Sequence, residues 1–171
     1  APRKGEALDE SFGFSYRYLF RGATIPVVPL LLRRDLPNQP TPNRCVDLGN
    51  AMRKVIDSCP LSVRVGVVAS GGLSHQVLDE SLDRQVLAAL SAGDFTMLRN
   101  LSSDRLNRAP GTPEILNWLV VAGAMVPAKM ELIAYQPGYR SLASTGPQST
   151  PSSGTRWTIT PSSSSSAGLE S

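Results

Sequence analysis

An apolar, β-branched run at residues 63–69 does most to limit the folds open to this chain of 171 residues. Its composition is typical of a buried strand, and stretches with helical periodicity lie on both sides of it. Two more apolar runs, at 25–32 and 130–135, and a helical stretch from 112 to about 125 extend the pattern. Alternating strands and helices predict an α/β fold with a largely buried sheet.

Local signals place the expected helices. Asn43 is expected to cap the first, and Pro60 to stop it. The second is expected over about 79–91, with Glu80 and Arg84 as an i,i+4 ion pair and a glycine marking its end. The third is expected to open with Thr112 as its cap and a proline at its first position.

Composition divides the chain into two parts. The hydrophobic fraction of 41% and charged fraction of 18% are near globular averages, and the length suffices to bury a core. Residues 1–146 are expected to form one domain. Residues 147–171 are dominated by Ser, Pro, Thr and Gly and cannot bury enough apolar surface to offset their ordering entropy. They are expected to be a disordered tail.

Charge and hydropathy exclude two classes of partner. The net charge of +3 is small and its basic residues are scattered, whereas a nucleic-acid groove needs a concentrated basic face. No apolar run reaches the roughly 18 to 20 residues of a membrane span, and no signal-peptide pattern follows the first residues. The expected location is the cytoplasm, with no nucleic acid or membrane as partner.

The two cysteines, Cys45 and Cys59, flank the first expected helix. Fourteen helical residues would separate them by about 21 Å, and a disulfide needs Cα atoms within about 7 Å. They are expected to be reduced, structural thiols.

His75 is the only histidine of the chain. A lone histidine is usually structural, but this one follows two adjacent glycines just past the carboxyl end of the clearest strand, where open α/β sheets place their ligands. Glycines let backbone approach a ligand, and a histidine can exchange protons near neutral pH. A functional His75 is therefore favoured. Glu114 lies in the first turn of a helix, where carboxylates interact well with the helix dipole, so by itself it is expected to be structural.

Two segments resemble class III (LigB-type) extradiol ring-cleavage dioxygenases. Val67-Val-Ala-Ser-Gly-Gly-Leu-Ser-His75 is similar to the segment carrying that family's acid/base histidine. Gly111-Thr-Pro-Glu-Ile-Leu-Asn-Trp118 is similar to the segment whose glutamate binds Fe(II). The stretches 37–44 and 139–141 also resemble family landmarks, in the expected order. The resemblance covers roughly residues 6–147.

The resemblance implies a three-layer α/β sandwich around a mixed sheet, lacking its N-terminal part. It implies a non-haem Fe(II) enzyme that opens catechol-type rings with O₂, with His75 as acid/base and Glu114 as the carboxylate ligand of iron. Family members take two metal-binding histidines from a region before the part covered here. This chain has one histidine in total, so its metal site is expected to be incomplete.

Three explanations stay open. The chain is a C-terminal fragment of such an enzyme, or a second subunit supplies the missing histidines, or it is a non-catalytic homologue that acts as a binding module. Its start at alanine favours a fragment, although removal of an initial methionine would look the same. The sequence does not decide whether further copies of the chain assemble.

Overall fold

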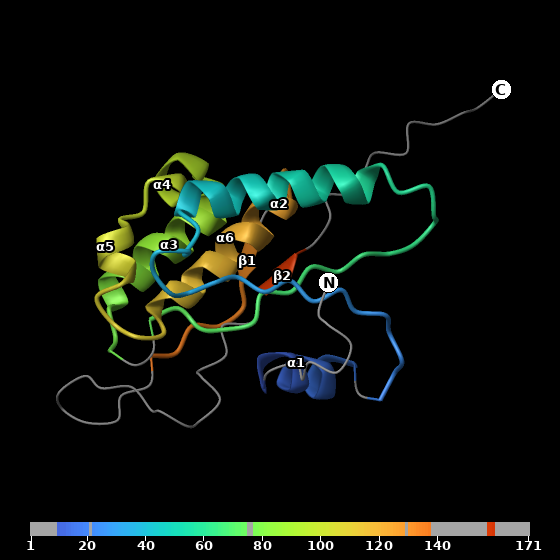
Figure 1. Cartoon of the computed structure of the whole chain (residues 1–171), viewed down its shortest axis with the longest axis horizontal. Helices are drawn as coiled ribbons and strands as arrows, with labels where there is room; N and C mark the ends of the chain where they lie inside the picture. The colour runs from blue at the N-terminus through green and yellow to red at the C-terminus, as the bar shows by residue number, and fades with distance from the viewer. Residues whose placement is uncertain (1–9, 21, 75–76, 129, 138–156, 160–171) are drawn as a thin grey trace.

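The computed structural model describes residues 10–20, 22–74, 77–128, 130–137 and 157–159. Most of the elements in these ranges are helices, with two short strands beside them (Figure 1). In chain order they are α1 (Glu10–Phe20), α2 (Pro42–Asp57), α3 (Glu80–Ala92), α4 (Phe95–Arg99), α5 (Ser103–Leu106), the 3₁₀ turn η1 (Thr112–Glu114), α6 (Ile115–Ala124), β1 (Met130–Leu132) and β2 (Trp157–Ile159).

Helix ends follow their capping residues. Thr41, rather than Asn43, caps α2 by accepting a hydrogen bond from the backbone N–H of Arg44. The helix ends at Asp57, ahead of Pro60. The prediction of Asn43 was wrong because a proline directly after Thr41 suits the first position of a helix, which moves the start back.

α3 agrees closely with its prediction. Asp79 accepts a hydrogen bond from the N–H of Leu82, and Gly93 ends the helix in the left-handed conformation (φ 70°). Glu80 and Arg84 form the expected ion pair at 3.3 Å.

The third predicted helix is divided in two. Residues Thr112–Glu114 form the 3₁₀ turn η1, and α6 begins only at Ile115. Gly111, with φ 89°, takes the cap position expected of Thr112. A glycine is suited to that place because positive φ is strained for other residues.

The core lies where α2 crosses α6. The two backbones touch at Gly49 and Gly123: a Cβ on Gly49 would lie 2.1 Å from the carbonyl oxygen of Val120, and one on Gly123 would lie 2.3 Å from that of Val46. Helices α3, α4 and α5 lie together on one side of this pair, near the start of α2, and add buried side chains to the same core (Figure 1). The largest fully buried apolar side chains are Val46, Leu82, Val86, Leu90, Leu98, Leu106, Ile115, Leu116 and Leu119.

The three-layer sandwich expected around a mixed sheet is not what the described residues form. Their sheet has two strands: β1 and β2 pair antiparallel, with Met130 opposite Ile159 and Leu132 opposite Trp157. The predicted strand at 130–135 is thus confirmed in part. The predicted strands at 25–32 and 63–69 are extended but unpaired within the described chain. Strands need partners for their backbone groups, and the apolar pattern alone supplies none.

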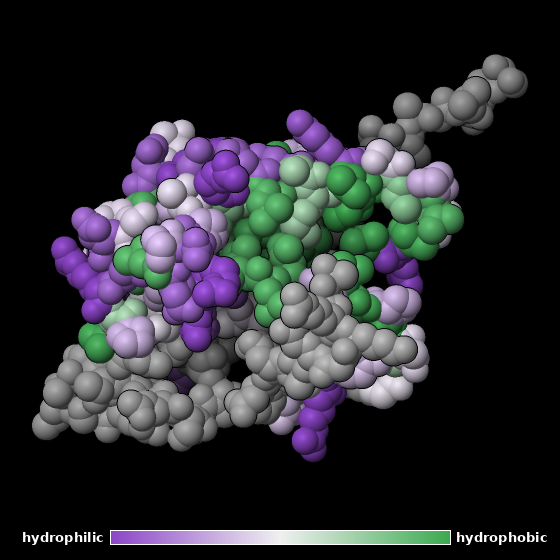
Figure 2. All heavy atoms as spheres, in the orientation of Figure 1, coloured by the Kyte–Doolittle hydropathy of each residue, from purple (hydrophilic) through white to green (hydrophobic). Residues whose placement is uncertain are grey.

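The two unpaired apolar segments leave much of their surface uncovered. Val28 is 93% exposed and Val63 is 58% exposed. Val55, in the C-terminal half of α2, is 69% exposed. Figure 2 shows apolar residues gathered along this part of α2 and the chain below it.

Other predictions have mixed outcomes. Cys45 is buried, Cys59 is exposed, and both are free thiols, as expected. The tail predicted at 147–171 lies outside the described residues except for 157–159, which form β2. No helix in the described ranges is long and apolar enough to cross a membrane.

Candidate functional site

The glycine-containing loop at 70–74 leads from the extended segment 63–69 towards α3. Gly71 has φ 116°, a conformation that L side chains rarely adopt. A Cβ on Gly71 would lie 2.5 Å from Oε2 of Glu114. The sequence therefore allows the loop backbone to lie directly against the glutamate.

Glu114 lies at the end of η1 with its side chain 20% exposed. Its Oε2 accepts a hydrogen bond from the backbone N–H of Gly72 at 3.1 Å. Its Oε1 pairs with Nη1 of Arg34 at 3.0 Å. The Arg34 side chain is 59% exposed, so solvent screens this ion pair.

The first turn of α6 holds the start of the same loop. Nδ2 of Asn117 donates to the carbonyl oxygen of Ser70 at 2.7 Å. Nε1 of Trp118 donates to the carbonyl oxygen of Gly71 at 3.2 Å. Together with Glu114, these side chains fix residues 70–72 on the N-terminal end of α6.

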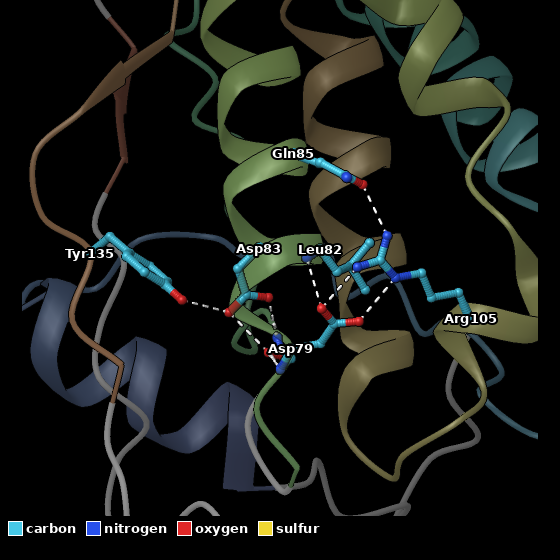
Figure 3. Close-up of polar contacts among 7 residues, drawn as sticks. Asp79, Leu82, Asp83, Gln85, Arg105 and Tyr135 are labelled. Atoms are coloured by element: carbon cyan, nitrogen blue, oxygen red, sulfur yellow. Dashed lines mark hydrogen bonds and ion pairs between the residues drawn. The ribbon is translucent and has the colours of Figure 1, made fainter. Parts of the chain in front are cut away.

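The first turn of α3 holds the other end of the loop. Asp83, 1% exposed, accepts hydrogen bonds from the N–H and the hydroxyl of Ser74, both at 2.9 Å. The hydroxyl of Tyr135 donates to Oδ2 of the same carboxylate at 2.8 Å (Figure 3). Asp79 is held by Arg105, whose guanidinium donates to both of its carboxylate oxygens (Figure 3).

Burial raises the pKa of two of these groups, and a charged partner lowers the pKa of the third. Burial raises the pKa of the Asp83 carboxyl, although its three hydrogen bonds oppose the shift. Burial, followed by the hydrogen bond to Asp83, raises the pKa of the Tyr135 hydroxyl. The hydrogen bond from Arg105 lowers the pKa of Asp79.

Of the two predicted site residues, the structure describes one. Glu114 lies against the loop that precedes His75, whereas His75 itself lies outside the described residues. Arg34 and Asp83 were not predicted. A signal for Asp83 existed, since it lies three positions before Val86 and four before Leu87, on the apolar stripe of α3.

The donor set does not complete a metal site. The described part of the chain holds no group of three or more His, Cys, Asp or Glu side chains that could bind a metal ion. The whole sequence has one histidine, whereas a two-histidine, one-carboxylate site needs two.

Comparison with known proteins identifies the family. Residues 16–146 match the catalytic LigB subunit of aromatic ring-opening dioxygenase. Gallate dioxygenase from Pseudomonas putida is 34% identical over 95 residues, which is 50% of this chain and 28% of that protein. The chain thus aligns with under a third of that relative's length. No solved structure shows a significant match. Because the family match spans most of the sequence, the chain belongs to the LigB family of aromatic ring-opening dioxygenase catalytic subunits.

Proposed function

We propose that this chain is part of a non-haem Fe(II) extradiol dioxygenase, an enzyme that opens catechol-type aromatic rings with O₂. In this proposal Glu114 is the carboxylate ligand of iron and His75 is the acid/base. The observation that carries it is the hydrogen bond from Gly72 to Glu114, which joins two segments 42 residues apart. These are the segments in which the family carries its proton-transfer and metal-binding residues.

The proposal requires two imidazoles from outside these 171 residues, because His75 is taken by the proton role. They would come from a longer form of this polypeptide or from a second subunit. We expect the three-layer α/β sandwich to form in that complete assembly, where the segments 25–32 and 63–69 gain strand partners. The proposed location is the cytoplasm.

An iron titration tests the incompleteness of the site. The purified chain should not bind Fe(II) stoichiometrically at micromolar concentrations under anaerobic conditions, because one carboxylate is a weak ligand set. Calorimetry, or iron retained after gel filtration, measures it. Stoichiometric binding by this chain alone would contradict the proposal.

A turnover assay tests the chemistry. After anaerobic Fe(II) loading, O₂ is added with gallate, the substrate in the name of the relative, or with protocatechuate. The chain alone should give no ring-fission product, detected by absorbance. The same mixture should give product once the chain is joined to a segment that supplies two histidine ligands. Product from the chain alone would refute the need for outside ligands.

The two proposed roles predict opposite defects in such a complete enzyme. His75→Ala should slow ring opening more than it lowers bound iron, since the acid/base acts outside the metal shell. Glu114→Ala should have the reverse balance and lower bound iron more than it slows ring opening by the iron that remains. Arg34→Gln is the matched control because it removes the ion partner of Glu114 but keeps the ligand. Equal iron loss in the His75 and Glu114 variants would count against these roles.

A non-catalytic homologue that acts as a binding module is the second candidate. Its support is the single histidine together with the exposed apolar segments at 25–32 and 63–69, which suit a protein partner. If the completed assembly binds iron but never turns over, this candidate is favoured.

A further inference from the structure

A fully buried carboxylate lies beside the loop that carries the proposed acid/base. Asp83 is on α3 and is 1% exposed, and Val86 and Leu87, one turn further along the same helix, are buried too. Placing a carboxylate among apolar side chains is costly unless hydrogen bonds compensate. Here two of its three donors come from Ser74 and the third is the hydroxyl of Tyr135 (Figure 3).

Both the backbone N–H and the hydroxyl of Ser74 are hydrogen-bonded. Its N–H donates to Oδ1 of Asp83, and its hydroxyl donates to Oδ2. The same hydroxyl oxygen accepts the backbone N–H of Asp79 at 2.8 Å. Ser74 is 5% exposed and lies against the first turn of α3. Its hydrogen bonds restrain both its backbone and its side-chain rotamer.

The residues that hold Ser74 are themselves joined by hydrogen bonds. Asp79 caps α3 and is held by Arg105, whose Nη1 also donates to Gln85 on the same helix at 3.0 Å. At the other end of the loop, Glu114, Asn117 and Trp118 bind residues 70–72. The loop is therefore attached to α6 at its start and to α3 at its end.

We propose that Asp83 is a positioning residue, which fixes the backbone that enters His75 through its two hydrogen bonds to Ser74. This inference rests on the proposed role of His75 as acid/base. An apolar side chain would fill this position in the core without the cost of burying a carboxylate. A carboxylate instead accepts hydrogen bonds from both donors of Ser74. Ser74 directly precedes His75, the proposed acid/base.

The single histidine of the chain provides a direct probe. Its imidazole C–H signals in a proton–carbon NMR spectrum belong to one residue, so the environment of His75 can be read in the full chain without catalysis. In the unmodified chain we expect one set of signals, shifted from the free-histidine values. In Ser74→Ala and in Asp83→Asn those signals should move to the free-histidine values.

Two controls separate positioning from general loss of structure. Tyr135→Phe removes one donor to Asp83 but leaves both bonds to Ser74, so the His75 signals should stay near their original place. The indole N–H signal of Trp118, whose partner is Gly71, should persist in all three variants and report an intact core. Ser74→Ala deletes one hydroxyl only, so it can still test the inference if Asp83→Asn unfolds.

Several results would overturn the inference. The inference fails if the His75 signals stay in place in folded Ser74→Ala and Asp83→Asn. It also fails if Tyr135→Phe shifts the His75 signals as far as those two variants do. Unfolding of all three variants would show that the cluster serves global stability instead. If the signals respond as expected but His75→Ala leaves turnover unchanged in a complete enzyme, the acid/base role fails while the positioning by Asp83 stands.

Discussion

At the scale of single residues, Gly71 is the position where the backbone of the site leaves least room. Its φ is 116°, and a Cβ at this position would lie 2.5 Å from Oε2 of Glu114, so both conformation and space oppose any larger residue. Gly71→Ala should lower the free energy of unfolding by about 1–3 kcal/mol and weaken the contact between loop and glutamate. Chemical denaturation measures the loss.

Gly66 is the matched control for Gly71. It lies in the extended segment before the loop, and a Cβ there meets no atom within 4 Å. Gly66→Ala should change the free energy of unfolding by no more than about 0.5 kcal/mol. Equal losses in the two variants would mean that the loop is not held against Glu114.

Cys45 links burial to pH. Burial raises the pKa of its thiol from 9.0 to about 11. The unfolded chain therefore loses the thiol proton first, so the stabilisation is complete below pH 9 and is lost as the pH rises towards 11. The free energy of unfolding should fall across this range, and Cys45→Ala should remove that part of the fall. Cys59→Ala, at the exposed thiol, should keep the slope of the unmodified chain, which denaturation at pH 8, 9.5 and 11 can test.

At the scale of elements, the crossing of α2 and α6 depends on two glycines. A Cβ on Gly123 would lie 2.3 Å from the carbonyl oxygen of Val46, so the helices must separate to admit it. Gly123→Ala should destabilise the chain by about 1–3 kcal/mol despite the better helix propensity of alanine. Thermal unfolding followed by circular dichroism measures the shift.

A second helical glycine controls for propensity. Gly13 in α1 has no atom within 4 Å of an added Cβ, so Gly13→Ala gains helix propensity without overlap. The midpoint of unfolding should stay or rise. A fall in Gly13→Ala as large as that in Gly123→Ala would show that close helix approach is not the cause.

Elements were predictable from the sequence where their determinants are local. α3 carries its cap, its apolar stripe and its terminal glycine within fifteen residues, from Asp79 to Gly93, and its prediction was nearly correct. The division of the third helix into η1 and α6 was missed because Gly111 was not recognised as the cap. The runs 25–32 and 63–69 have strand composition, but pairing depends on partners far away, which composition cannot supply.

The candidate site shows the same limit. Motif similarity singled out Glu114 and His75, yet the contact between Glu114 and Gly72 spans 42 residues and follows from tertiary packing. The ion pair with Arg34 spans 80 residues. Asp83 could have been noticed as an acidic residue on an apolar stripe, whereas its bond to Tyr135 depends on how the chain returns after α6.

At the scale of the whole molecule, the described chain combines a tight helical core with a wide apolar surface. Val86 is fully buried in α3, whereas Val28 and Val63 are mostly exposed on extended segments. Exposed strand-like segments with unpaired backbone groups tend to associate with other chains. The isolated chain should therefore bind a hydrophobic dye while folded and should self-associate as its concentration rises.

Charged substitutions distinguish that surface from the core. Val28→Lys and Val63→Lys should reduce self-association in sedimentation velocity and reduce dye fluorescence, because each places a charge on the surface that associates. Neither should lower the midpoint of thermal unfolding much, since both side chains already contact solvent. Val86→Lys, with its charge in the core, should abolish cooperative unfolding. If Val28→Lys unfolded the chain as Val86→Lys does, the segment 25–32 would be part of the core. If the unmodified chain stayed monomeric and bound no dye, the apolar surface would not be available to a partner.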